Sequence, residues 1–324
     1  MARLAVVAVA CVGLVGCGQV GGSAGKPPAA GSPDAGKSLV EAREGFQTKL
    51  VSRGPNHPAP PDKPPGNQFK LVTYEAAPGK LAAYLTPDTG DKGLPAIVWI
   101  TGGDCNSIDR GVWMPAKPDN DQTAAQYRRQ GIVMMFPSLR GGNNNPGKKE
   151  GFFGEVDDVL AATAYLAKQS QVDPKRIYLG GHSTGGTLAL LVAEAAPAGT
   201  YRDVFAFGPV ADVAGYGPDN EFCPFDMSDK RELELRAPGR WLHAIKTPTF
   251  VIEGEFNGNW PSIQTMQRTN RNELVHFLKV AKADHFSVLA AVNKVLAAKV
   301  VADRGDISTL TLTEDEVNAA VRGR

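Results

Sequence analysis

The residues RIYLGGHSTGGTLAL, numbered 176–190, decide the fold of this chain. The apolar run from Arg176 to Gly180 predicts a buried strand, and the residues from Gly186 onward predict a helix. The pentapeptide GHSTG lies between them, where a sharp strand-to-helix turn exposes the serine hydroxyl. Glycine permits such a turn and lets helix and strand approach closely. The stretch therefore predicts Ser183 as a nucleophile next to the positive end of a helix.

Short apolar runs alternate with helical patterns on both sides of this turn. Such alternation is typical of a mostly parallel sheet with helices on both faces. Upstream, residues 69–74 and 81–85 alternate apolar and polar positions and predict an antiparallel hairpin. The expected strands are 96–100, 132–136, 176–180, 204–208, 249–252 and 274–280, and the expected helices lie near 123–129, 155–168, 186–194, 262–271 and 286–300. We therefore expect a doubly wound α/β-hydrolase fold over residues 67–305, with a small cap insertion at about 211–246 and a C-terminal extension, 306–324.

A glycine-rich loop follows the first strand of the parallel sheet. The strand 96–100 continues into Thr101-Gly102-Gly103-Asp104, where exposed backbone can approach a substrate carbonyl. In this fold the oxyanion hole uses one amide from this loop and one from the residue after the nucleophile. The expected donors are the N–H groups of Gly103 and Thr184, although an ordinary glycine turn is the alternative.

Chain order selects one histidine as the base. The chain has five histidines, and in this fold the order is nucleophile, acid and then histidine, the last in a loop after the final strand. His285 follows the strand 274–280 and precedes the last predicted helix, so it is the expected base. The other four lie in the proline-rich segment, the nucleophile turn, the cap and a strand.

The acid is open among several residues. The loop after the strand 249–252 reads Glu253-Gly254-Glu255-Phe256-Asn257, and Asn257 stands where many relatives of this fold carry aspartate. Glu253 is the favoured acid, because the longer side chain of glutamate can reach His285 from the strand end. Asp212 and Glu255 remain alternatives, as does a Ser183–His285 dyad oriented by Asn257.

Four further motifs resemble the prolyl oligopeptidase and dipeptidyl aminopeptidase branch of the α/β hydrolases. They are PSLRGG (137–142), GEVDD (154–158), VDPKRI (172–177) and ADHF (283–286). The resemblance covers residues 96–300 and implies acyl transfer from an ester or peptide to water, without a metal or organic cofactor. The chain departs from the branch because it has no room for a β-propeller and because the usual acid is replaced. A hydrolase scaffold retained for binding, without catalysis, is the alternative function.

The first residues resemble a bacterial lipoprotein signal. Arg3 precedes an apolar run, 4–15, and Leu14-Val15-Gly16-Cys17 resembles a lipobox, which implies cleavage after Gly16 and acylation of Cys17. An ordinary secretory signal is the alternative. Residues 17–66 are then expected to be a tether and proline-rich linker with a short helix, and the protein to be anchored in the cell envelope.

Composition restricts the partners. The formal net charge is +1, which disfavours nucleic-acid binding because phosphate backbones require a basic surface. The expected partners are a small ester or peptide substrate and a membrane contacted through the lipid on Cys17; the sequence leaves the oligomeric state open. Cys105 and Cys223 fit either a disulfide in an oxidising compartment or two buried thiols.

Overall fold

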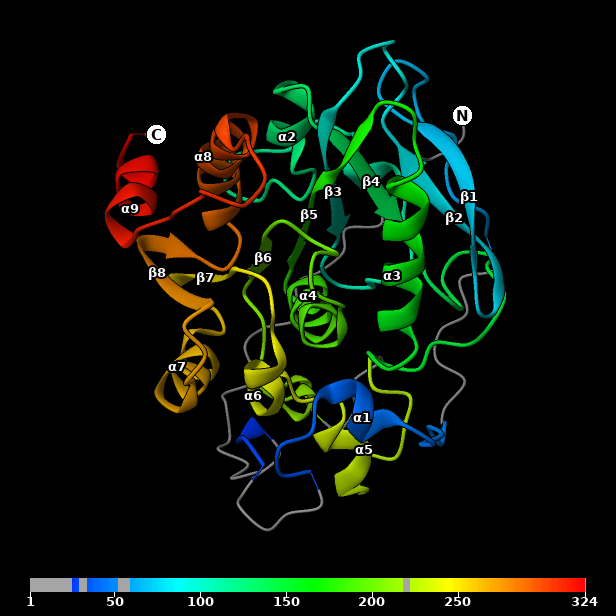
Figure 1. Cartoon of the computed structure of the whole chain (residues 1–324), viewed down its shortest axis with the longest axis vertical. Coiled ribbons are helices and arrows are strands. Elements are labelled where there is room, and N and C mark those ends of the chain that lie inside the picture. The colour runs from blue at the N-terminus through cyan, green and yellow to red at the C-terminus, as the bar shows by residue number, and fades with distance from the viewer. Residues whose placement is uncertain (1–24, 29–33, 52–58, 218–221, 324) are drawn as a thin grey trace, which may run out of the picture.

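The computed structural model describes residues 25–28, 34–51, 59–217 and 222–323, and these ranges contain an eight-stranded sheet (Figure 1). The strands lie in the order β1-β2-β4-β3-β5-β6-β7-β8. β1 pairs antiparallel with β2 and β2 with β4, whereas every pair from β4 to β8 is parallel. The strands are β1 (Lys70–Ala76), β2 (Gly79–Leu85), β3 (Leu94–Ile100), β4 (Val133–Pro137), β5 (Val172–His182), β6 (Val204–Phe207), β7 (Thr249–Phe256) and β8 (Val275–Asp284).

Helices cover both faces of the sheet. The face under α3 and α4 buries one set of alternate strand residues, such as Val98 and Leu179. The face under α2 and α8 buries the other set, such as Trp99 and Phe205. The longer helices are α3 (Glu155–Leu166), α4 (Thr184–Ala195), α7 (Trp260–Thr269), α8 (Val288–Ala302) and α9 (Glu314–Arg322), and α2 (Ala125–Arg129) is a short helix. The predicted α/β-hydrolase fold with an N-terminal antiparallel hairpin is therefore confirmed.

The insertion after β6 consists of short helical turns. They are η3 (Val213–Tyr216), α5 (Lys230–Glu234), α6 (Pro238–Trp241) and η4 (Leu242–Ala244). α6 contacts α4, and an antiparallel bridge between Leu50 and Phe225 joins the insertion to the N-terminal segment. Figure 1 shows α5 and α6 beside the N-terminal helix α1 (Leu39–Arg43), at the bottom of the view. The turn η2 (Arg110–Val112) follows the glycine-rich loop.

The last residues pack onto the domain. α9 contacts β8 and α8, and Leu312 and Val317 are buried in the same apolar layer as α8. In the described ranges no helix has the length and apolar character needed to cross a bilayer. Cys17 and His57 lie outside the described residues.

Candidate active site

Ser183 occupies a strained turn between β5 and α4. Its backbone has φ 58° and ψ −117°, in the positive-φ range that residues with a β-carbon rarely adopt. Such a conformation costs about 1–3 kcal/mol and persists where the surroundings enforce it. Here the Ser183 N–H donates to the carbonyl of Phe207 at 2.8 Å. A β-carbon at Gly185 would lie 2.3 Å from the Ile100 carbonyl oxygen, so the motif's second glycine is required by close packing.

Glu253 and His285 meet across the carboxyl ends of β7 and β8. The His285 Nδ1 lies 2.8 Å from Glu253 Oε2. The same carboxylate accepts hydrogen bonds from the N–H groups of Gly254 at 2.7 Å and Asn259 at 3.0 Å. Glu253 is fully buried, and His285 is 8% exposed. Three donors therefore satisfy a carboxylate that water does not reach.

This hydrogen bond sets the tautomer of His285. A carboxylate only accepts, so Nδ1 carries the proton and Nε2 is left with a lone pair, as a general base requires. Among the described residues there is no hydrogen bond between Ser183 Oγ and His285. In free enzymes that contact is often long and shortens when substrate binds.

The other candidate acids are engaged elsewhere. Asp212 caps η3 by accepting from the Ala214 N–H at 2.9 Å, and burial raises its pKa. Glu255 accepts from the Lys282 N–H, which lowers its pKa, and forms an ion pair with Lys279 at 3.4 Å. Asn257 has φ 48° in the turn that leads to Gly258 and Asn259. Of the three carboxylates considered, the structure places only Glu253 against His285.

His182 supports the loop that carries His285. Its Nε2 lies 2.9 Å from the His285 carbonyl oxygen, so this nitrogen carries a proton and donates, while Nδ1 faces Gln122 at 3.1 Å. The two imidazole rings lie 4.5 Å apart between centroids. Burial, followed by the neighbouring His285, lowers the pKa of His182 to about 3. His182 is therefore neutral at physiological pH.

Gly208 is a site residue that the sequence analysis treated only as a strand end. It has φ 58°, and a β-carbon there would lie 2.5 Å from His285 Cε1 and 2.8 Å from Glu253 Oε2. Its carbonyl accepts from Asn259 Nδ2 at 2.8 Å. In the sequence, the available signal was a glycine at the end of the strand that precedes the one carrying Glu253. Glycines at strand ends are too common for this signal alone to identify a site.

The glycine-rich loop lies beside the nucleophile. A β-carbon on Gly102 would be 3.3 Å from the Ser183 Cβ. Thr184 Oγ1 donates to the Gly103 carbonyl at 2.8 Å and so fixes the loop to the start of α4. The N–H of Thr184 belongs to the first turn of α4, whose amides have no acceptor within the helix. Lys149 holds the loop from the other side through a 2.6 Å ion pair with Asp104.

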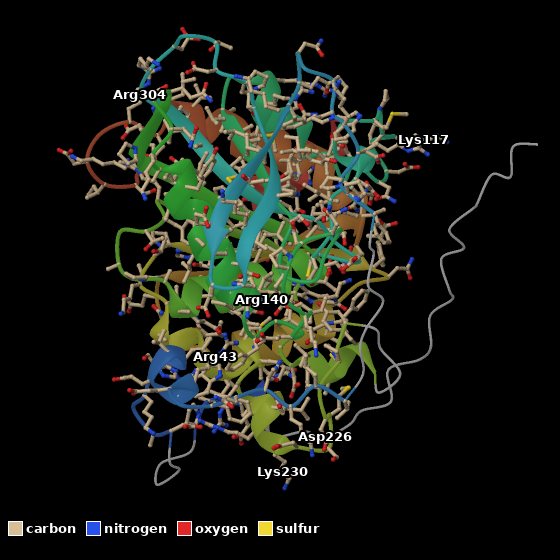
Figure 2. All side chains as sticks on the ribbon, turned by 90° about the vertical axis from the view of Figure 1, so that its right-hand side faces the viewer. Arg43, Lys117, Arg140, Asp226, Lys230 and Arg304 are labelled. Carbon is tan, nitrogen blue, oxygen red and sulfur yellow. The ribbon has the colours of Figure 1, made fainter. Side chains whose placement is uncertain are left out.

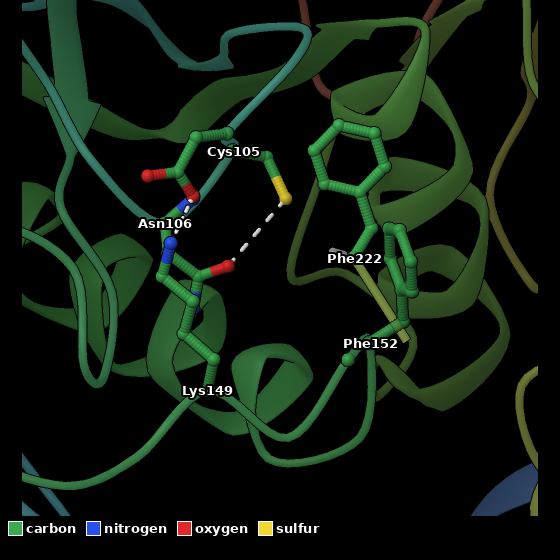
Figure 3. A pocket seen from close by; sticks show the side chains of 7 residues that line it. Cys105, Asn106, Lys149, Phe152 and Phe222 are labelled. Atoms are coloured by element: carbon green, nitrogen blue, oxygen red, sulfur yellow. Dashed lines mark hydrogen bonds and ion pairs between the residues drawn. The ribbon is translucent and has the colours of Figure 1, made fainter. Parts of the chain in front are cut away.

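A small hollow adjoins this loop (Figure 3). Cys105, Phe152 and Phe222 line it with apolar groups, and Lys149 lies at its edge. Its cavity volume is about 10 Å³, room for a single water molecule. Phe152 has φ 69°, a rare backbone conformation for a bulky residue.

Both described cysteines are free and buried thiols. Burial raises the pKa of Cys223 to about 12 and that of Cys105 further still. Neither is therefore a thiolate at neutral pH. Within the described ranges, no group of three or more histidine, cysteine or acidic residues is arranged to hold a metal ion.

The fold is that of an α/β hydrolase, and it brings Ser183, His285 and Glu253 to the carboxyl ends of its parallel strands. Residues 119–298, more than half of the chain, match the prolyl oligopeptidase family. The chain therefore belongs to the prolyl oligopeptidase family, which confirms the family resemblance seen in the motifs.

Relatives at the sequence level include hydrolases and peptidases. The chain is 30% identical to S-formylglutathione hydrolase of Rattus norvegicus over an alignment of 155 residues, and the match covers 41% of this chain and 52% of that protein. It is 32% identical to prolyl oligopeptidase A of Galerina marginata (strain CBS 339.88) over an alignment of 130 residues, and the match covers 38% of this chain and 16% of that protein. The chain thus spans about half, or less, of the length of these relatives.

Solved structures share the fold. A 2,6-dihydroxy-pseudo-oxynicotine hydrolase has a TM-score of 0.57 and 13% identity, with coverage of 77% of this chain and 72% of that one. An esterase from the archaeon Pyrobaculum calidifontis has a TM-score of 0.53 and 16% identity, with coverage of 82% and 86%. At this identity the likeness concerns the fold alone.

Proposed function

We propose that this chain hydrolyses an ester or a peptide bond through an acyl-enzyme on Ser183. The observation that carries the proposal is the buried 2.8 Å hydrogen bond between His285 and Glu253, at strand ends that adjoin a strained serine. His285 Nε2 takes the Ser183 proton as the hydroxyl oxygen attacks the carbonyl carbon. The amides of Gly103 and Thr184 stabilise the oxyanion, and each such donor is worth about 3 kcal/mol of barrier.

Proton return completes the reaction. Protonated His285 gives its proton to the leaving alcohol or amine as the bond to the acyl carbon breaks. Water then attacks the acyl-enzyme, with His285 again as base, and Ser183 is released. Glu253 accepts the hydrogen bond from Nδ1 throughout and stabilises the imidazolium. The acyl side chain is proposed to enter the hollow between Phe152 and Phe222, beside the glycine-rich loop.

We further propose a lipid anchor on Cys17 and a location in the bacterial cell envelope. The lipobox-like LVGC (14–17) supports this, together with the Gly-, Ala- and Pro-rich residues that follow.

A fluorophosphonate probe tests the nucleophile. The wild type is expected to be labelled, and Ser183→Ala to lose labelling and hydrolysis at unchanged thermal stability, because only one oxygen is removed. Labelling that persists in Ser183→Ala would refute the assignment. A panel of aryl esters and aminoacyl amides then decides between esterase and peptidase.

A further inference from the structure

Four consecutive carbonyl groups, 150–153, accept hydrogen bonds from two arginines. Arg236 Nη2 donates to the Glu150 carbonyl at 2.9 Å, and its Nε donates to that of Gly151 at 2.6 Å. Arg43 Nη2 donates to the Phe152 carbonyl at 3.0 Å, and its Nη1 to that of Phe153 at 3.1 Å. We call Arg43 and Arg236 the arginine clamp.

The two members of the arginine clamp come from different parts of the chain. Arg236 lies in the cap insertion. Arg43 is the last residue of α1, in the N-terminal segment 34–51, which precedes the part of the chain that matches the family. Figure 2 labels Arg43 on the blue N-terminal segment, below Arg140.

The clamp holds an unusual backbone. Gly151 and Phe152 have φ values of 63° and 69°, so two successive residues adopt the left-handed conformation. Glycine tolerates this conformation and phenylalanine disfavours it. The Phe153 ring lies under both guanidinium groups, with the Arg43 and Arg236 Cζ atoms 4.6 and 5.0 Å from its centroid. The hydrogen bonds from the arginine clamp to carbonyls 150–153, and the contacts of both guanidinium groups with the Phe153 ring, together oppose relaxation of residues 150–153.

The position of the Phe152 ring follows from this backbone. The ring stacks on Tyr216 with centroids 5.8 Å apart and lines the hollow opposite Cys105 (Figure 3). If the backbone relaxed to negative φ, the Phe152 Cα–Cβ bond would point elsewhere and the hollow would widen.

Resting on the function proposed above, we propose that Arg43 is a positioning residue for substrate specificity. Through Phe152, it keeps the acyl pocket small. The N-terminal segment 34–51 therefore restricts the enzyme to short acyl groups, such as acetyl, and disfavours longer ones, such as hexanoyl.

A double-mutant cycle tests this on p-nitrophenyl acetate and hexanoate. Arg43→Lys retains the charge but lacks the planar fork that reaches several carbonyls. Phe152→Gly removes the ring and accepts positive φ without strain. Each variant is expected to raise the hexanoate-to-acetate ratio of kcat/KM about tenfold, mainly through a lower KM for hexanoate. The double variant is expected to match Phe152→Gly, because Arg43 acts through Phe152.

Arg231→Lys is the matched control. Arg231 also attaches the N-terminal segment to the cap, through Asp34 at 2.5 Å and the Ala42 carbonyl at 2.6 Å, but it does not bond to residues 150–153. Its ratio should equal that of the wild type. An Arg43→Lys ratio equal to the Arg231→Lys ratio would overturn the proposal.

Two further outcomes keep the test decisive. If Arg43→Lys alone does not fold, Phe152→Gly is compared with the wild type, and an unchanged hexanoate-to-acetate ratio overturns the proposal. A wild type that hydrolyses neither ester and resists the fluorophosphonate refutes the proposed function instead.

Discussion

At the scale of single residues, the distance between a carboxylate and an imidazole decides which acid serves the proposed reaction. Glu253→Gln should lower kcat by up to about 10⁴-fold with little change in KM. The amide is neutral, so it cannot stabilise the imidazolium, and its NH₂ group can select the wrong tautomer of His285. Steady-state kinetics on an aryl ester measure both constants.

Asp212→Asn and Glu255→Gln are the controls for this prediction. Both carboxylates are bonded to backbone amides away from His285, so their variants should keep near-normal kcat. If Asp212→Asn lost the larger factor, the assignment of Glu253 would be wrong.

The sequence left this acid open for a physical reason. The usual aspartate position holds Asn257, and a glutamate earlier in the strand serves only if the loop folds back around it. Here a β-carbon on Gly258 would lie 2.8 Å from Glu253 Oε2, and the Asn259 N–H reaches the same oxygen. That enclosure depends on tertiary packing, which residue types alone do not reveal.

Gly208 offers a second prediction at the residue scale. Gly208→Ala would place a methyl carbon 2.5 Å from His285 Cε1, so the imidazole must move. Displacement of a reacting group by about 1 Å can cost about 10²-fold, and kcat/KM should fall by at least about that factor.

Gly199→Ala is the control for Gly208→Ala, because it introduces backbone strain without any contact with His285. Gly199 has φ 81°, but no atom would lie within 4 Å of an added β-carbon. It should lose about 1 kcal/mol of stability from backbone strain alone, without losing activity. Equal kcat/KM values for the two variants would contradict the role given to Gly208.

At the scale of elements, the apolar runs predicted the central strands because those strands are buried on both faces. β3 and β7 contain all the expected residues, and the ends of β4 and β6 differ by one residue from the expected ranges 132–136 and 204–208. The start of β5, residues 172–175, was missed because Asp173-Pro174-Lys175 is polar, and the pairing of β5 with β3 shifts register there. The short turns of the cap could not be predicted, since each is much shorter than the window of about 11–18 residues over which an amphipathic pattern can be recognised.

The connection between α8 and α9 provides a prediction of pH dependence. Ser308 donates to the buried carboxylate of Asp203, at 2.9 and 2.8 Å from its two oxygens. Burial raises the pKa of Asp203 from 3.8 to about 7. The folded state therefore binds this proton more tightly than the unfolded state, and its contribution to stability is present below pH 3.8 and lost as pH rises towards 7.

Asp203→Asn should remove this loss, because an amide does not titrate. Urea unfolding measures the free energy of unfolding of both proteins across pH 4 to 7.5, a window set by this pKa shift. The difference, variant minus wild type, should increase as pH rises. Asp303, which is present in both proteins, has a pKa shift of the opposite sign. Burial raises the pKa of Asp303, but the hydrogen bonds from Arg202, Thr309 and Tyr178 outweigh burial, so its pKa is lowered. Parallel pH profiles for the two proteins would contradict the prediction.

At the scale of the whole molecule, the N-terminal segment shows what composition cannot predict. Its residues read as a tether and linker, yet Asp34 pairs with Arg231 and Arg240 of the cap at 2.5 and 3.3 Å. Thr48 and Lys49 both donate to Glu232 at 2.7 Å. These partners are separated by about 200 residues, so no local pattern indicates that they meet.

The proposed lipid anchor on Cys17, which precedes segment 34–51 in the sequence, gives the last prediction. Cys17→Ser should move the protein from the membrane to the soluble fraction, because each acyl CH₂ buried in a bilayer contributes about 0.8 kcal/mol and serine cannot carry the thioether lipid. No helix in the described ranges offers a second, spanning anchor. Fractionation after a high-salt wash measures the distribution, and Ser183→Ala, with Cys17 intact, should remain in the membrane pellet. Fluorophosphonate labelling of soluble Cys17→Ser should match the wild type, because the proposed site is assembled entirely from residues 101–285. A Cys17→Ser protein that stays in the washed pellet would show that something other than acylation of this cysteine holds it there.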